Sequence, residues 1–368
     1  MDTRLYVAAG GGGDALAAAM LHAASAPNAR AVVATYAWDR LLIDPLPGPR
    51  PARDFTGLAP VGANLWQVTA QSAPVPPAGS SLPRMAAELD AQLLLLDPYL
   101  GGAGMGAALA EAVRVFTPSR VTLVDVGGDV LARGPEAELK SPLADLLALS
   151  CCARLDAAEV DVAVLGVGLD GELPPAYTRE RIAEYGGRPG PRLEVGHVDA
   201  IAQLLSWHPS EASGMLAASA GGVRGTVEVR DAGSHIALGE DSPDSWLMPA
   251  AAVAAGCLLT EPLAATETLE QVEAVVRSVC GRSELDYERR KAAALGQAST
   301  PTQAGELSER YARFVREGAA RGSDYVTIRR MAESIGAPRG AGFEAWRAAL
   351  IAAEPGRYAR PLWSLRPA

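Results

Sequence analysis

Residues 4–25, RLYVAAGGGGDALAAAMLHAAS, place four consecutive glycines between a short apolar run and an alanine-rich stretch. The apolar run predicts a buried strand and the alanine-rich stretch predicts a helix, so the glycines form the turn between them. Glycines there allow backbone N–H groups to converge on an anion beside the positive end of the helix. Asp14 follows directly and would repel a simple phosphate, although a helix N-terminus by itself also favours a carboxylate. The stretch predicts a ligand-binding turn that contains an acid.

Apolar runs of the same kind recur along the first half of the chain, with helical patterns between several of them. Strands are predicted at residues 4–9, 31–38, 65–70, 91–97, 120–126 and 160–168, and helices at residues 14–25, 82–90 and 104–116. Alternating strands and helices predict an α/β fold with a doubly wound, Rossmann-like and mostly parallel sheet. Such sheets bind ligands at the carboxyl ends of their strands.

The pattern changes towards the C-terminus. From about Thr300 the chain has a helical pattern rich in Arg and Glu, as in GELSERYARFVREGAARG at residues 305–322. We predict a Rossmann-like domain with glycine-rich anion-binding loops over residues 1–299, and a helical C-terminal extension over residues 300–368. The extension would either pack on the domain or bind a partner.

Composition and charge limit the classes of partner and cofactor. The 368 residues carry a formal net charge of -10, which disfavours duplex nucleic acid and anionic membranes as the main partner. The start lacks the pattern of a secretion signal and no run approaches membrane-spanning length, so a cytoplasmic location is expected. The four cysteines and four histidines match neither zinc spacing, nor a disulfide framework, nor a catalytic triad. We therefore predict no metal and no cofactor.

Two further turns with glycine follow predicted strands, in VDVGGDVLARGPEAELKSPLAD at residues 124–145 and in LGVGLDGEL at residues 165–173. Both place glycine beside an acid, although Asp-Gly is also an ordinary turn pair. The candidate catalytic acids are Asp14, Asp39, Asp129 and Glu172, with Asp170 as a substrate-binding acid. The glycines expected to line an anion site are Gly11, Gly12, Gly13, Gly127 and Gly128. Several acids at strand ends predict polar chemistry, because buried carboxylates need partners or shifted pKa values.

Three cations are available to neutralise a bound oxyanion: Arg40 and Arg50 in WDRLLIDPLPGPR, and Lys140. Ser141 precedes a proline and is expected either as the N-cap of a helix or as a polar substrate contact. Read as G-x-G-x-x-A, the first turn also matches a dinucleotide fingerprint weakly, with Asp39 as the acid for a ribose hydroxyl.

Several long motifs occur in an order that resembles one archaeal and actinobacterial family, the domain of unknown function eleven-fifty-two. They are GGGGDA, WDRLLIDPLPGPR, LLLLDPYLGGAGM, VDVGGDVLARGPEAELKSPLAD, LGVGLDGEL and HPSEASGMLAASAGGVRGTVEVRDAG, and the resemblance covers Arg4 to Leu295. The family as such implies no reaction. The chain also resembles the actinobacterial branch that includes the aziridine-forming enzyme of azinomycin-type biosynthesis. That resemblance implies elimination of a sulfate ester as a neighbouring amine closes on carbon, a substrate carried on a small amino-group carrier protein, and a small partner subunit.

The residues fit this chemistry. A carboxylate, Asp129 or Asp14, would take the proton of the amine. The glycine turns would cradle the departing sulfate or phosphate, and Arg40, Arg50 and Lys140 would neutralise it, so no metal or organic cofactor is needed. Two alternatives stay open: a nucleotide-binding hydrolase or transferase acting at a ribosyl or phosphate bond, and a non-catalytic scaffold whose C-terminal helices bind a partner.

Overall fold

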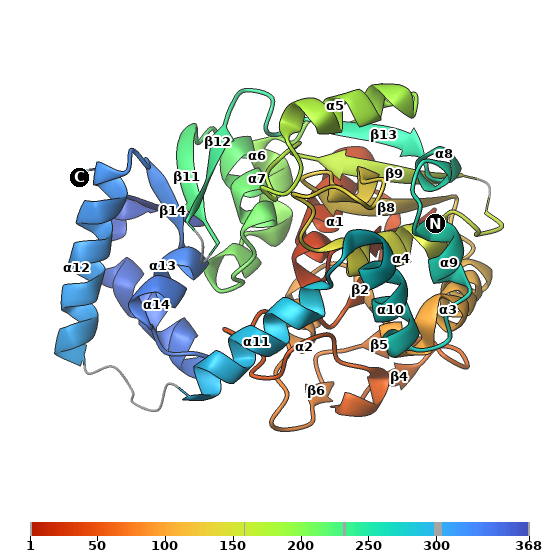
Figure 1. Ribbon diagram of the computed structural model, residues 1–368, viewed down its shortest axis with the longest axis horizontal. Helices are drawn as coiled ribbons and strands as arrows, with labels where there is room; N and C mark the ends of the chain where they lie inside the picture. The colour runs from red at the N-terminus through yellow and green to blue at the C-terminus, as the bar shows by residue number, and fades with distance from the viewer. Residues whose placement is uncertain (1, 158, 231–232, 298–303, 367–368) are drawn as a thin grey trace.

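The computed structural model describes residues 2–157, 159–230, 233–297 and 304–366. In this part of the chain nine strands form one sheet in the order β10-β13-β9-β8-β1-β2-β7-β5-β4. Figure 1 labels β13, β9, β8, β2, β5 and β4 among them. Its five central strands run parallel: β1 (Thr3–Ala8), β2 (Arg30–Tyr36), β7 (Gln92–Leu96), β8 (Arg120–Val126) and β9 (Val160–Leu165). The outer strands pair antiparallel: β4 (Ala59–Pro60), β5 (Trp66–Val68), β10 (Arg188–Pro189) and β13 (Ser245–Pro249). The predicted α/β fold with a mostly parallel sheet is confirmed.

The order of the strands reverses between β1 and β8. From β1 the chain builds outward through β2 to β7, and β8 then returns to the other side of β1, with β9 beyond it. This order defines a doubly wound sheet, and the crevice at the reversal is where such sheets bind ligands. Because β1 and β8 are parallel and Ala8 pairs with Val124, the turns that follow both strands meet at this crevice.

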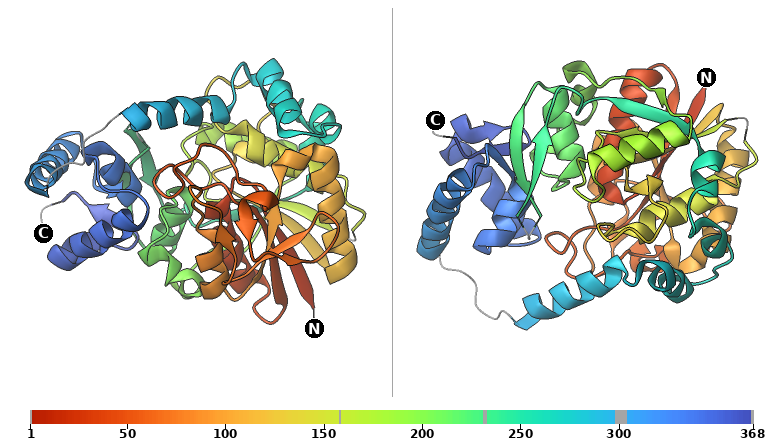
Figure 2. Two further views of the ribbon diagram at one scale, coloured as in Figure 1. Left: turned by 90° about the horizontal axis from the view of Figure 1, so that it is seen from below. Right: turned by 45° about the horizontal axis from the view of Figure 1, so that its top comes forward.

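Helices cover both faces of the sheet (Figure 2). In β1, Leu5 and Val7 point to one hydrophobic cluster and Tyr6 and Ala8 to the other, as the two-residue period of a strand requires. The first cluster includes α3 (Gly101–Phe116), α4 (Pro142–Cys152), α8 (Ala250–Ala255), α9 (Thr260–Ala264) and α10 (Leu269–Cys280). The second includes α1 (Gly12–Ser25), α2 (Leu82–Glu88), α6 (Val195–Val198) and α7 (Ala212–Ala220).

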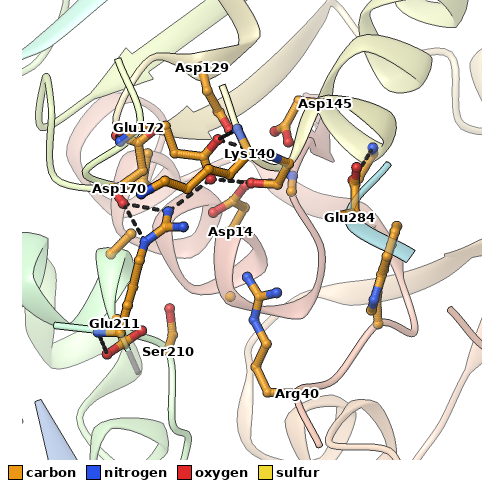
Figure 3. A pocket seen from close by; sticks show the side chains of 18 of the residues that line it. Asp14, Arg40, Asp129, Lys140, Asp145, Asp170, Glu172, Ser210, Glu211 and Glu284 are labelled. Atoms are coloured by element: carbon orange, nitrogen blue, oxygen red, sulfur yellow. Dashed lines mark hydrogen bonds and ion pairs between the residues drawn. The ribbon is translucent and has the colours of Figure 1, made fainter. Parts of the chain in front are cut away.

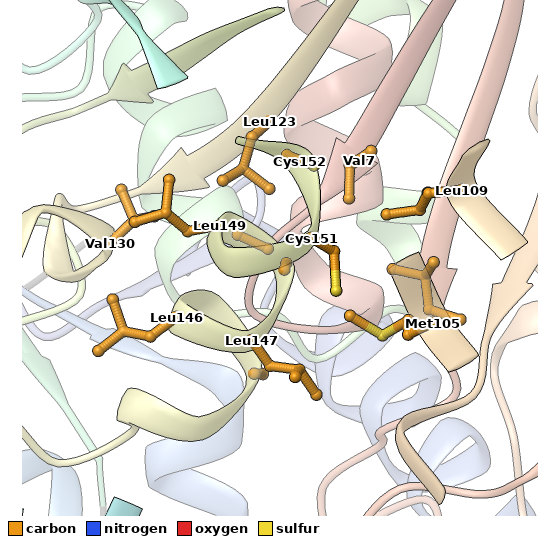
Figure 4. Close-up of a cluster of buried hydrophobic side chains, with 14 of the residues drawn as sticks. Val7, Met105, Leu109, Leu123, Val130, Leu146, Leu147, Leu149, Cys151 and Cys152 are labelled. Carbon is orange, nitrogen blue, oxygen red and sulfur yellow. The ribbon is translucent and has the colours of Figure 1, made fainter. Parts of the chain in front are cut away.

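Helix α4 is buried along its whole length. It packs between the sheet and the neighbouring helices α3, α9 and α10, which explains why its sequence is apolar apart from Asp145 and Ser150. Figure 4 shows Leu146, Leu147, Leu149, Cys151 and Cys152 of this helix among Val7, Met105, Leu109 and Leu123. Both cysteines are free thiols. The packing fixes the first turn of α4 beside the carboxyl end of β8.

A second sheet, in the order β12-β11-β14-β16-β15, crosses the predicted domain boundary. Its strands are β11 (Gly225–Val229), β12 (Ser234–Leu238), β14 (Tyr325–Thr327), β15 (Tyr358–Ala359) and β16 (Leu362–Ser364). The predicted C-terminal helices are present as α12 (Ala304–Ala320), α13 (Ile328–Ile335) and α14 (Ala341–Ala353). The short strands among them were missed, because two or three residues carry no measurable periodicity. The predicted boundary at residue 299 lies outside the described residues.

The remaining elements connect these layers. They are α5 (Pro175–Glu184), α11 (Glu284–Gln297), the short pair β3 (Phe55–Thr56) and β6 (Ala73–Pro74), and single 3-10 turns such as Asp129–Leu131. Helix α11 runs from the main sheet towards the C-terminal helices (Figure 1). Among the described helices, none is both long enough and apolar enough to cross a membrane.

Candidate active site

A cavity of about 490 Å³ lies at the crevice between the ends of β1 and β8 (Figure 3). Its wall comes from the turns after β1, β2, β8 and β9, from the first turn of α4 and from the start of α11. The segment that leads into α7, the end of β11 and Arg329 complete the wall. The cavity brings together nine residues predicted from the sequence: Gly13, Asp14, Asp39, Arg40, Asp129, Lys140, Ser141, Asp170 and Glu172. Residues that the sequence analysis proposed separately therefore meet at one cavity, and their functional roles stay predictions.

The glycine turns provide space for carboxylates. The N–H of Gly10 donates to Oδ2 of Asp14 at 2.7 Å, and a Cβ on Gly10 would stand 2.9 Å from that oxygen. Gly127 has a φ of 122°, and a Cβ there would stand 2.2 Å from Cγ of Asp170. A larger residue at either position would displace the acid beside it. The first turn thus binds its own carboxylate, which explains why an aspartate follows the glycines.

The glycines predicted to cradle an anion have different roles. Gly13 lines the cavity, whereas Gly11 is the N-cap of α1 and Gly12 its first residue. The N–H of Gly127 donates to the carbonyl of Leu165 at 3.0 Å, which extends the pairing of β8 with β9 into the turn. The turn at Gly127 and Gly128 therefore does not offer the predicted cradle, because the Gly127 N–H is used within the sheet and the Gly128 N–H acts on the Asp125 carboxylate.

Burial raises the pKa values of the acids in the cavity. For Asp14 burial raises the pKa to about 7, and for Asp170 burial and then the charge of the nearby Glu172 do the same. For Asp125, burial and then neighbouring carboxylates raise the pKa well above its usual range. The pKa values of Asp129 and Asp145 are raised well above the usual range by the same two causes. All five side chains line the cavity, and Figure 3 shows Asp14, Asp129, Asp145 and Asp170 around one region of it.

Glu172 differs from the other acids because it is fully paired. Its Oε2 accepts from the N–H groups of Lys140 at 2.7 Å and Ser141 at 2.9 Å, and its Oε1 accepts from Arg230 at 2.8 Å and from the Ser141 hydroxyl. Burial alone would raise the pKa of Glu172, but Arg230 and these hydrogen bonds outweigh burial and lower it. A carboxylate held ionised in this way is a weak base, so Glu172 serves to position the segment before α4.

The N-terminus of α4 is capped by an acid from a distant element. Ser141 is the N-cap residue, as one of the two predictions had it, but its hydroxyl donates to Glu172 and makes no cap hydrogen bond. Oε1 of Glu284 accepts from the N–H of Leu143 at 3.0 Å and of Ala144 at 3.3 Å instead. The start of α11 is thereby fixed against the cavity.

Two of the three predicted cations reach the cavity. Arg40 and Lys140 line it, and the Arg40 side chain is 47% exposed. Arg50 is buried and does not line the cavity: its Nε lies 3.0 Å from Oδ2 of Asp44, and its Nη2 donates to the carbonyl of Gly48 at 2.9 Å. The prediction that Arg50 binds the oxyanion is wrong, because its charge stabilises the proline-rich loop.

Several residues of the cavity were missed by the sequence analysis as site residues. Asp125 carried a signal, since it is a charged residue within an otherwise apolar strand, and Asp145 lies in the first turn of a predicted helix. Arg230 and Glu284 also line the cavity, but they are not part of the glycine turns and lie far along the sequence from them. Nothing in their local sequence could have placed them there.

His208 makes the folding stability depend on pH. Burial, with Arg347 adding to it, lowers the pKa of this imidazole to about 3, whereas in the unfolded chain it is about 6.5. The unfolded chain binds the extra proton below pH 6.5, so this contribution to stability is lost as pH falls. Between about pH 7.5 and about pH 5 we expect a loss of roughly 2 kcal/mol. Urea unfolding at both pH values gives the change in the free energy of unfolding for the wild type and for His208→Gln. The difference between these two changes is the contribution of His208. If the free energy of unfolding changed equally in both proteins, the prediction would be wrong.

The fold and the cavity define a class of protein: a Rossmann-like α/β protein with an acidic cavity where the strand order reverses. The chain belongs to the family described as protein of unknown function (DUF1152), whose profile matches residues 5–292. The match covers the main sheet except the first two residues of β1, and it confirms the family resemblance of the motifs. No curated protein and no solved structure matches the chain.

Proposed function

We propose that the protein is an enzyme that closes a ring on a small amine, with loss of sulfate or phosphate. The amine would attack a carbon that carries the ester, which gives an aziridine when the two groups stand on neighbouring carbons. The observation that carries this proposal is one cavity in which buried carboxylates and cationic side chains both reach the ligand space. Carboxylates suit an amine that must lose a proton, and cations suit a departing oxyanion.

Asp170 is the proposed base. Its Oδ2 is buried without a hydrogen-bond partner, and its pKa of about 7 suits proton transfer near neutral pH. As the nitrogen lone pair forms the N–C bond, the C–O bond breaks with its electrons going to the ester oxygen, and the nitrogen passes its proton to Asp170. Of the bases predicted from the sequence, Asp129 has a pKa well above the usual range. Asp14 has a pKa of about 7 like Asp170, but neither of its carboxylate oxygens is among the buried atoms without a hydrogen-bond partner.

Arg40 and Lys140 are proposed to neutralise the departing oxyanion. Both line the cavity, and the positive charge of Arg40 acts on Asp14, which places the cation and the acids within electrostatic reach of each other. Figure 3 shows the Arg40 guanidinium directed towards Asp14. A fixed cation beside the leaving group stabilises charge as it develops in the transition state.

A panel of small vicinal amino-alkyl sulfate and phosphate esters tests the reaction. We expect the protein to release the inorganic anion and to form the cyclised amine, both followed by mass spectrometry above the rate without enzyme. Each ester is also offered on an amino-group carrier protein and with a small partner subunit, which the proposal includes as partners. Release of the anion without ring closure would identify a hydrolase and refute the cyclisation.

The strand order and Asp39 favour a second candidate, a nucleotide-binding hydrolase or transferase. Asp39 lines the cavity at the end of β2, where a dinucleotide fold places the acid that binds ribose. Calorimetry with nucleotides distinguishes the candidates, and tight binding would favour this one over the cyclase. If the protein with Asp14→Asn, Asp129→Asn and Glu172→Gln together kept its function, a scaffold would be favoured instead.

A further inference from the structure

We infer that Asp14, Asp125 and Asp145 form a binding site for one hard divalent cation, Mg²⁺ or Mn²⁺. One carboxylate oxygen from each of the three residues lies within 4.8 Å of the others. Oxygens bound to one Mg²⁺ at about 2.1 Å stand about 3 Å apart when adjacent and about 4.2 Å apart when opposite, and oxygens at the about 2.4 Å typical of Ca²⁺ stand up to about 4.8 Å apart when opposite. The three oxygens are therefore close enough together to approach the spacing of ligands of a single ion.

Unpartnered carboxylate oxygens point to a ligand at this place. Oδ2 of Asp125 and Oδ1 of Asp145 are buried and have no hydrogen-bond partner, and the two residues are only 1% and 3% exposed. Oδ1 of Asp145 would lie 3.2 Å from a Cβ on Gly10, so it is directed at the turn that holds Asp14. A buried oxygen without a partner costs about 1–3 kcal/mol and more when charged. A bound cation would supply the missing partner for both.

The three ligands come from rigid elements. Asp125 lies in β8 at the centre of the sheet, and Asp145 lies in the first turn of the fully buried α4. Asp14 lies in the first turn of α1, where the Gly10 N–H holds its Oδ2 at 2.7 Å. Little conformational entropy would be lost on binding, because the site is formed before the ion arrives.

The chemistry of the ligands selects the ion. All three are carboxylates, which favour Mg²⁺, Ca²⁺ or Mn²⁺ over the ions that prefer thiolate or imidazole. Three protein ligands leave other positions of a six-coordinate ion open, and these face the cavity, because all three residues line it. An oxyanion of the ligand could occupy them. That last step rests on the proposed function, whereas the cation site itself does not.

Binding of Mn²⁺ to the metal-stripped full-length protein tests the site independently of any reaction. We titrate the protein with Mn²⁺, follow the paramagnetic signal of the free ion, and compete with Mg²⁺. We expect one ion per chain, displaced by Mg²⁺, and an increase in melting temperature with the ion present. Binding of no ion by the wild type at millimolar Mn²⁺ would overturn the inference, whatever the outcome of the ester panel.

Variants locate the ion. Asp125→Asn and Asp145→Asn should each weaken Mn²⁺ binding by at least about tenfold, the lower end of the cost of losing a supporting group at a metal site. Asp161→Asn is the matched control, because Asp161 is a buried aspartate of the adjacent strand that pairs with Arg120 at 3.0 Å outside the cavity. If the control weakened binding as much as the two variants, or if the two variants bound normally, the ion would lie elsewhere and the inference would be wrong.

Discussion

Replacing Asp170 with Asn should lower the turnover of the ester identified in the panel by about 10²- to 10⁴-fold, the usual contribution of a positioned base. Asn has the same shape and can still accept from the Glu172 N–H, which donates to Oδ1 of Asp170 at 3.2 Å. The change therefore removes the proton acceptor with little effect on the fold. Steady-state kinetics should assign the loss to kcat, with KM changed much less.

Two further variants make this prediction specific. Asp161→Asn, outside the cavity, should retain the wild-type kcat. Asp129→Asn should lower kcat by less than Asp170→Asn, because burial and the neighbouring carboxylates raise the pKa of Asp129 well above its usual range and so favour its protonated form over the free base. If Asp170→Asn were fully active and Asp129→Asn inactive, the base would be Asp129, as the sequence predicted.

Replacing Glu228 with Ala should destabilise the protein by about 3–5 kcal/mol, the cost of breaking a buried ion pair on one side. Glu228 lies in β11 and is 0% exposed. Its two oxygens lie 2.8 Å from nitrogens of Arg321 and Arg330, which belong to the C-terminal segment. The pair thus joins the second sheet across the predicted domain boundary.

Chemical denaturation followed by circular dichroism measures this loss. Glu306→Gln is the control, since Glu306 pairs with Arg310 on the surface of α12, and exposed pairs contribute at most about 1 kcal/mol. If Glu228→Ala lowered the free energy of unfolding by less than about 1 kcal/mol, the stability of the C-terminal segment would not depend on the contacts of Glu228 with Arg321 and Arg330.

Local sequence was enough to predict the parallel centre of the main sheet, whereas its outer strands β4, β10 and β13 were not predicted. The runs at residues 4–9, 31–38, 91–97, 120–126 and 160–168 became the five parallel strands, because a strand buried on both faces is apolar throughout. The strand at 65–70 was also predicted, but it pairs antiparallel with β7 at the outer side. The strands β14 to β16 were not predicted, because they form only where β11 is available for pairing.

The acids of the site followed from the sequence for the same local reason. Asp14, Asp129 and Asp170 each stand next to a glycine turn at a strand end, and parallel strands bring such turns to one edge. What the glycines do was decided by the tertiary structure. Gly10 and Gly127 leave room for Asp14 and Asp170, which only the distances between neighbouring turns could reveal.

The sequence by itself determined the class of fold, the family, and the edge of the sheet where the acids gather. Only the tertiary structure decided which charges meet there: that Arg230 pairs with Glu172, that Arg50 stays with Asp44, and that Asp125 and Asp145 lie beside Asp14. The physical reason is the sequence distance over which the deciding interactions act. Strands, turns and helix starts depend on neighbours a few residues away, whereas the partner of a charge is set by how distant segments pack.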